Sequence, residues 1–100
     1  VPKAAVDEFR MMTQQYQYMQ KNKINTIDAL KAHVNDLVHD RTELLALQHR
    51  MYVDRSFSDE QRKEVNEKVR TSWKALRICE RIGRSHEDLQ EQIQDSLMER

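Results

Sequence analysis

Five basic side chains in the second half of the chain recur at a spacing that could bind an anion: Arg70, Lys74, Arg77, Arg81 and Arg84. Their separations of four and three residues would place all five within about 80° of one helix face, since each residue turns a helix by about 100°. Such a face suits nucleic acid, anionic phospholipid or an acidic partner helix. It is also typical of a solvated helix whose arginines pair with neighbouring carboxylates, and we prefer this second interpretation.

The charge balance of the chain argues against nucleic acid as the partner. The sequence holds 17 Lys and Arg against 17 Asp and Glu, so its formal net charge is zero. This balance hides a contrast, because residues 58–84 carry eight basic and five acidic side chains, whereas residues 85–100 carry one basic and five acidic. The aromatic residues mostly fall on predicted packing stripes and are not interleaved with the basic residues. A protein partner is therefore favoured over nucleic acid or anionic lipid.

A second candidate for chemistry is a histidine followed by two carboxylates. His33, Asp36 and Asp40 would share one face of a helix, and this spacing could direct them toward one metal ion. Carboxylate sites in helical bundles, however, combine a Glu-x-x-His pattern with inward-facing carboxylates from several helices, and this pattern is missing. The three residues lie on the polar side of the best apolar stripe. We therefore expect a solvated face, with no metal and no cofactor.

The chain shows no recognisable set of catalytic residues. It has no glycine-rich loop to bind phosphate and no nucleophile with an obvious base beside it, so we expect that it is not an enzyme. Cys79 is the only cysteine, which rules out an internal disulfide and favours a reducing compartment, the cytoplasm or the nucleus. No apolar run approaches the ~20 residues that a transmembrane helix needs.

The elements that must position these residues are helices. Between Lys3 and Ile82 there is no glycine and no proline, and apolar residues recur every three or four positions. We predict an all-α fold, an antiparallel bundle of three long helices with coiled-coil-like packing. The helices are expected at about Lys3–Lys21, Ile27–Val53 and Asp59 to near the carboxyl end. The whole chain, residues 1–100, is expected to form one domain of a longer protein, because it starts at Val1 and not at methionine.

The predicted helix boundaries differ in strength. Ser58 followed by Gln61 is a capping box, so a helix should start there. The signal around Asn25 and Thr26 is modest, and one continuous helix over residues 3–53 is an open alternative. Gly83 either ends a helix in a left-handed conformation or is tolerated inside one long helix at about 1 kcal/mol.

Two apolar stripes should form the packing seam of the bundle. The expected seam residues are Ile27, Leu30, Val34, Leu37, Leu44 and Met51 on the second helix and Val69, Trp73 and Leu76 on the third. Arg41 and Gln48 fall at positions of the stripe where apolar residues would be expected.

The unequal lengths of the predicted helices point to a function. The ends of the longest helix lack cover from the shorter ones, and an uncovered apolar stripe normally binds a partner. The leading hypothesis is a non-enzymatic interaction or assembly module that packs on a partner helix or on another copy of itself. The alternative is electrostatic binding of nucleic acid or anionic membrane through the basic stripe from Arg70 to Arg84. Phe57, just before the capping serine, is either a local packing residue or an exposed anchor for a partner, and the choice between monomer and dimer is open.

Overall fold

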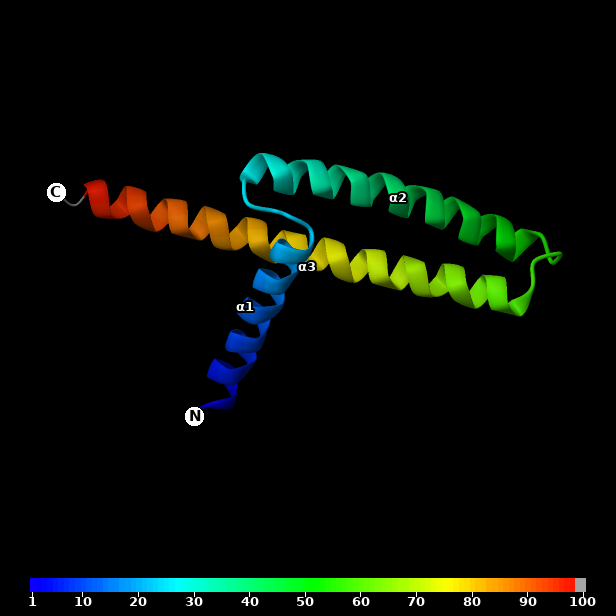
Figure 1. Ribbon diagram of the computed structural model, residues 1–100, viewed down its shortest axis with the longest axis horizontal. Helices are drawn as coiled ribbons and strands as arrows, with labels where there is room; N and C mark the ends of the chain where they lie inside the picture. The colour runs from blue at the N-terminus through cyan, green and yellow to red at the C-terminus, as the bar shows by residue number, and fades with distance from the viewer. Residues whose placement is uncertain (99–100) are drawn as a thin grey trace. The chain divides into compact units, whose positions relative to one another are not determined.

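Over residues 1–98 the chain folds into three helices joined by two short turns. The computed structural model describes residues 1–98, without the side chains of Ser96 and Leu97. Helix α1 runs over Lys3–Lys21, α2 over Ile27–Val53 and α3 over Asp59–Met98, and no strand occurs in the described residues (Figure 1). Helices α2 and α3 pack against each other in opposite directions. The predicted all-α helical bundle and its helix boundaries are confirmed.

The turn between α1 and α2 is a Schellman motif, so residues 3–53 form two helices. The Ile24 N–H donates to the Met19 carbonyl at 2.9 Å, and the Lys23 N–H donates to the Gln20 carbonyl at 3.3 Å. Lys23 adopts a left-handed conformation with φ of 56°, a position that glycine usually occupies. The motif ends on Ile24, whose side chain is buried. Thr26 then caps α2 by accepting the Ala29 N–H at 3.0 Å on its hydroxyl.

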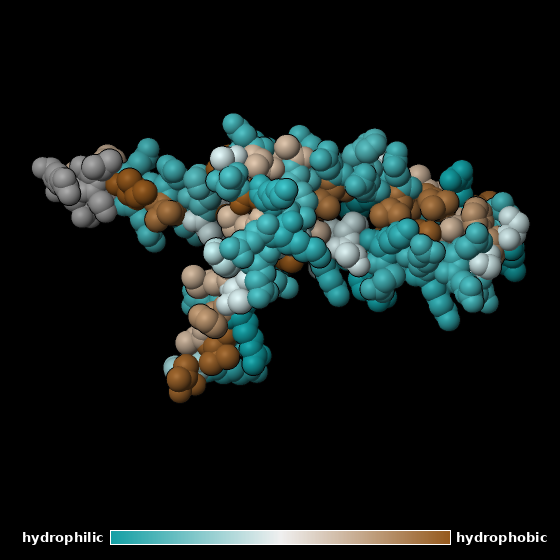
Figure 2. Space-filling view, viewed as in Figure 1, coloured by the Kyte–Doolittle hydropathy of each residue, from teal (hydrophilic) through white to brown (hydrophobic). Residues whose placement is uncertain are grey.

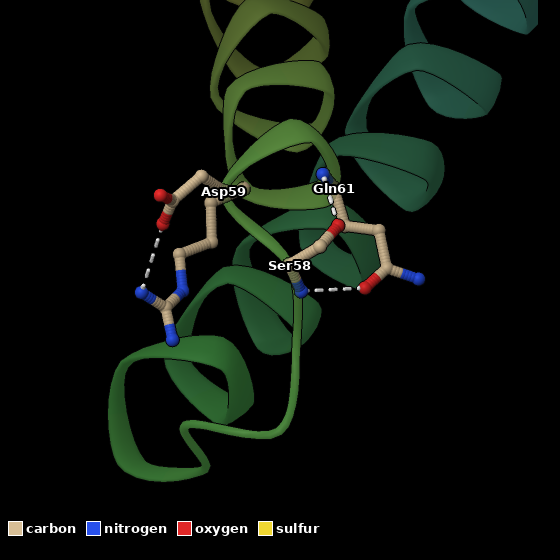
Figure 3. A network of polar contacts seen from close by, with 4 residues as sticks. Ser58, Asp59 and Gln61 are labelled. Atoms are coloured by element: carbon tan, nitrogen blue, oxygen red, sulfur yellow. Dashed lines mark hydrogen bonds and ion pairs between the residues drawn. The ribbon is translucent and has the colours of Figure 1, made fainter.

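The turn between α2 and α3 contains the predicted capping box (Figure 3). The Ser58 N–H donates to Gln61 Oε1 at 2.8 Å, and the Gln61 N–H donates to Ser58 Oγ at 3.1 Å. The preceding chain is held by Asp54, whose carboxylate accepts the Ser56 N–H at 3.0 Å, and this hydrogen bond lowers the pKa of Asp54. Two donors at the start of α3 are thereby satisfied, which fixes its first residue.

Helix α3 continues through Gly83 without a break. Gly83 does not adopt a positive φ, and a Cβ added there would meet no atom within 4 Å. The glycine is therefore tolerated inside the helix, the second of the two sequence interpretations.

Gly83→Ala should stabilise the protein by about 0.5–1 kcal/mol, because alanine loses less backbone entropy in a helix and the site has room for the methyl group. Urea unfolding followed by circular dichroism measures the change. As a matched control, Ala46→Gly at an exposed position inside α2 should lose a similar amount. A Gly83→Ala variant less stable than the parent would show that the glycine serves a purpose other than continuing the helix.

The contacts divide the chain into two compact units, each with a small core. The first unit comprises Val1–Leu30 and the end of α3 from Ile78, and the second comprises Lys31–Arg77. The buried residues of the first unit are Ile24, Leu30, Cys79 and Ile82, and those of the second are Met51, Val65 and Ser72. Among the described residues, no large side chain is completely buried. Both cores are therefore narrow stripes between helices.

In the second unit, the residues of the two predicted apolar stripes differ in burial. Val34, Leu37 and Leu44 on α2 are half-buried and Met51 is buried, while Val69 and Leu76 on α3 are half-buried. Of the other predicted seam residues, Ile27 and Leu30 belong to the first unit, where Ile27 is half-buried and Leu30 buried.

Trp73 differs from its predicted place in the seam. Half of its surface is exposed, and its neighbour Ser72 occupies the buried position between Val69 and Leu76. The Trp73 ring lies at the edge of the seam, with the Arg77 guanidinium 5.3 Å from the ring centroid. The contact between the Arg77 cation and the Trp73 ring lies within α3 and is of the cation–π kind.

The two polar residues in the α2 stripe bind α3 directly. Arg41 donates from Nη1 to the Val69 carbonyl at 3.1 Å and to Ser72 Oγ at 3.2 Å. Gln48 donates from Nε2 to Asn66 Oδ1 at 2.8 Å. Polar partners at single seam positions favour one alignment of two helices over its alternatives. The polar residues that interrupt the apolar pattern therefore fix the alignment of α2 with α3.

Candidate interaction surface

Helix α1 exposes a row of large apolar side chains. Phe9, Met12 and Tyr16 are 71%, 61% and 62% exposed, and no residue of α1 is buried. Their spacing of three and four residues places them on one side of the helix, which we call the α1 apolar face. Figure 2 shows apolar atoms, in brown, gathered over the N-terminal half of α1. This helix thus has the periodicity of a packing helix, yet no other described part of the chain covers these three side chains.

The C-terminal end of α1 is held in the first unit by a phenol and a thiol. The hydroxyl of Tyr18 forms a hydrogen bond with the sulfur of Cys79, which is buried on α3. Burial raises the pKa of Tyr18, and the adjacent Cys79 raises it further. Burial also raises the pKa of the Cys79 thiol, partly offset by the hydrogen bond from Tyr18. Both groups are therefore held in their neutral forms.

This pair predicts a loss of stability at alkaline pH. The pKa values of Tyr18 and Cys79 are higher in the folded chain than in the unfolded chain. Their contribution to the free energy of unfolding is therefore fully present below the unfolded cysteine pKa of about 8.5. It is lost as the pH rises past this value and past the unfolded tyrosine pKa of about 10. Thermal unfolding between pH 7 and 11 should show a falling midpoint. The decline should be shallower in a Tyr18→Phe, Cys79→Ala double variant, and identical slopes would contradict this prediction.

An apolar groove lies beside this anchored end of α1. It encloses about 350 Å³, and its apolar lining is Met19, Ile24, Ile27, Leu30, Ile82 and Leu89. Beyond Ile82, the apolar stripe of α3 loses its cover, since Leu89 is 55% and Ile93 49% exposed. The first unit therefore has two uncovered apolar surfaces, the α1 apolar face and the stripe of Leu89 and Ile93.

The two uncovered surfaces differ in charge. Beside the α1 apolar face the charges have both signs, since Asp7, Glu8 and Arg10 all lie within one helical turn of Phe9. Residues 85–98, which we call the α3 tail, contain four acidic residues and no lysine or arginine. The acidic residues of the tail are Glu87, Asp88, Glu91 and Asp95. The α3 tail is therefore acidic, whereas the α1 apolar face is bordered by charges of both signs.

The basic stripe of the sequence is divided between the two units. In the second unit, Arg70 pairs with Glu67 at 3.0 Å, Lys74 is exposed and Arg77 lies over Trp73. In the first unit, Arg81 is half-buried and Arg84 pairs with Glu80. The two ion pairs are solvent-exposed and lie within one helix, an arrangement that contributes little to stability.

Phe57 lies at the end of the α2–α3 turn in the second unit. It is half-buried and lines a shallow groove of about 360 Å³ together with His49, Arg50 and Val53 at the end of α2. The side chain therefore packs near the last turn of α2. This position fits the local packing role, one of the two roles that the sequence suggested.

The histidine–carboxylate candidate does not assemble into a metal site in the part of the chain that the structure describes. No three His, Cys, Asp or Glu side chains of residues 1–98 are grouped to hold an ion. His33 is half-buried, whereas Asp36 and Asp40 are exposed. His39 instead faces Glu43, with Nε2 and Oε1 3.3 Å apart.

None of the described helices is long and apolar enough to cross a membrane. No protein-family model, no curated protein and no solved structure matches this chain.

Proposed function

We propose that this chain is a non-enzymatic protein–protein interaction and assembly module that acts by packing helices on its first unit. The observation that carries the proposal is the α1 apolar face: Phe9, Met12 and Tyr16 are all more than half exposed, on a helix that buries no residue. Their spacing is the one by which helices pack along each other. A helix that presents such a row to water gains stability when a second helix covers it.

The physical drive for such packing is apolar burial. Covering apolar surface contributes about 25 cal/mol per Å², and a fully buried aromatic side chain removes about 150–250 Å² from water. Phe9 and Tyr16 are 71% and 62% exposed, so most of their apolar surface is still available for burial by a partner. A contiguous apolar patch with charged borders is characteristic of binding sites for proteins. Because Cys79 is a buried free thiol, we place this function in a reducing compartment, the cytoplasm or the nucleus.

The test uses a synthetic helix as a probe. A labelled amphipathic peptide with leucine at the seam positions of a heptad repeat and a balanced charge on its other faces is titrated with the protein, and anisotropy is recorded. The parent protein should bind the peptide, and Phe9→Ala with Tyr16→Ala should weaken binding by at least about 30-fold, as expected for aromatic anchor residues. Tyr52→Ala is the matched control, because Tyr52 is 87% exposed but lies in the second unit.

Two controls separate this function from electrostatic binding through the basic stripe. A scrambled peptide of the same composition keeps the charge but loses the apolar row, so it should not bind. Apolar packing should also persist when salt is raised from 50 to 300 mM, whereas binding to phosphate falls steeply with salt. Equal binding of both peptides, or no effect of Phe9→Ala with Tyr16→Ala, would refute the proposed function.

A further inference from the structure

We infer that the second unit binds a small organic anion, a phosphate or carboxylate group on an apolar body, in a groove at the end of α2. This site lies apart from the α1 apolar face and does not depend on the proposed function. The groove encloses about 450 Å³, a volume that suits a small-molecule ligand. Its lining consists of Gln48, Met51 and Tyr52 of α2, Arg55 of the turn, and Arg62 and Asn66 of α3. All of them belong to the second unit.

The charge of this groove is positive. Arg55 and Arg62 line it, and none of the described lining residues is acidic. Arg55 is exposed and forms no ion pair or hydrogen bond with any other described residue. The guanidinium of an arginine holds several N–H donors in one plane, which match the oxygen atoms of a carboxylate or a phosphate. The groove therefore selects an anion of this kind.

The charge of Arg62 is only weakly neutralised by the chain itself. Its ion pair with Asp59 joins Nη1 and Oδ1 across 3.7 Å, which is longer than a hydrogen bond, and the Asp59 side chain is 92% exposed. The Nε atom of Arg62 is buried and has no hydrogen-bond partner. Buried donors in native proteins normally find an acceptor. An anion that draws the guanidinium toward the groove would supply acceptors to Arg62.

The hydrogen bond between Gln48 and Asn66 leaves a further donor for the ligand. Gln48 Nε2 donates to Asn66 Oδ1 at 2.8 Å, so this bond uses the oxygen of the Asn66 amide. The Asn66 Nδ2 group keeps its two N–H donors, and no other described residue accepts them. Asn66 lies one helical turn after Arg62, so the two side chains share one face of α3. Together with Arg55, they give the groove three side chains that donate hydrogen bonds to an anion.

The α2 side of the groove suits the apolar body of the ligand. Met51, which is buried, and Tyr52, which is 87% exposed, both line the groove. A thioether and an aromatic ring form favourable contacts with an apolar or aromatic group. An inorganic ion would contact the arginines but would leave these two side chains unused. An organic anion therefore fits the whole lining better than a free phosphate ion does.

Two-dimensional NMR of the full chain tests the site with two probes, phenyl phosphate and phenylacetate, which carry the two anionic groups on one ring. At least one of them should shift the Nε–Hε signal of Arg62 together with the backbone signals of the lining residues, and the tighter binder identifies the preferred group. Inorganic phosphate should bind at least about 10-fold more weakly, because it lacks the ring. No shift at Arg62 with either probe would overturn the inference, and so would equal binding of phosphate and phenyl phosphate.

Substitutions of the two arginines separate this site from general attraction of anions to a basic surface. Arg55→Gln and Arg62→Gln should each weaken binding of the tighter probe at least about 10-fold, as expected for the loss of a charge-assisted hydrogen bond. Arg62→Lys should weaken binding as well, because lysine keeps the charge but not the planar set of donors. Circular dichroism checks that each variant is folded. Arg55 is exposed in the turn, so Arg55→Gln provides the test even where a change of Arg62 disturbs the fold.

Arg70→Gln is the matched control for these variants. Arg70 lies in the same unit and carries the same charge, but it pairs with Glu67 and does not line the groove. Its replacement should leave the dissociation constant within about twofold of the parent value, because a distant exposed charge contributes little. An equal loss in Arg70→Gln, unchanged binding in Arg55→Gln, or parent-like binding by a folded Arg62→Lys variant would overturn the inference.

Discussion

Ile24→Ala should destabilise the first unit by about 2–5 kcal/mol, the range for truncating a buried isoleucine. Ile24 is among the most buried side chains of the chain and ends the Schellman motif that terminates α1. It also lines the apolar groove, so its loss removes contacts at the point where α1 is anchored. Since α1 has no buried residue of its own, the other contacts that hold it include the Tyr18–Cys79 hydrogen bond and the half-buried Met19 in the groove.

The thiol of Cys79 provides the measurement. It is buried and hydrogen-bonded to Tyr18 at the end of α1, so a thiol reagent reaches it only when the first unit opens. Labelling of Cys79 should accelerate at least about 30-fold in Ile24→Ala, since each 1.4 kcal/mol changes an equilibrium tenfold. Val53→Ala, at an exposed site of the second unit, should leave the rate unchanged. Unchanged labelling in Ile24→Ala would mean that α1 is held by contacts other than the Ile24 side chain.

Met51→Ala should have an effect of similar size on the second unit, about 2–5 kcal/mol. Met51 and Val65 are the two buried apolar residues of this unit, and its other aliphatic side chains from the two stripes are only half-buried. No other large side chain can replace its volume, and alanine would leave the seam open to water. Denaturant unfolding measured by circular dichroism gives the loss.

Met11→Ala is the matched control for Met51→Ala. Met11 is exposed on α1 and lies outside the α1 apolar face, so the same change of residue type removes little buried surface. Its cost should stay within about 0.5 kcal/mol, as for most surface substitutions. Equal losses in the two variants would show that Met51 contributes helix propensity alone.

The sequence was sufficient to predict the elements of this fold, because their signals are local. The missing glycine and proline, the apolar rhythm and the Ser58–Gln61 capping box each act within a few residues, and the three helices begin and end where these signals place them. The break after Lys21 was harder to predict. Its motif uses Lys23 in a left-handed conformation, so the glycine that usually marks such a turn is missing from the sequence.

The details of the seam depend on contacts between residues far apart in the chain, which the apolar pattern does not encode. Ser72 and Trp73 are neighbours, and either could face α2 by spacing alone. The smaller residue lies in the seam because Arg41 reaches across to bond Ser72 Oγ and the Val69 carbonyl. In the folded chain Ser72 is buried and hydrogen-bonded to Arg41, and Trp73 is half exposed.

The sequence shows the spacing of the α1 apolar face but does not show that this face is exposed. Phe9, Met12 and Tyr16 have the spacing of core residues, and only the three-dimensional fold reveals that α1 buries none of its side chains. The basic stripe from Arg70 to Arg84, the most regular charge pattern of the sequence, is divided between the two units. Periodicity identifies a helix face that can pack. Only the fold shows whether another part of the same chain packs on that face.

A helix that is exposed along most of its length also has a consequence for the lifetime of the protein in a cell. Proteases cut chains that open locally, and α1 has few contacts that oppose opening. Binding that covers α1 adds its free energy to the folded state by mass action, so the assembled molecule should outlast the single one. Copies of this chain that are synthesised in excess of the partner would then be degraded faster than the bound copies. The abundance of this chain should follow the amount of its assembled form.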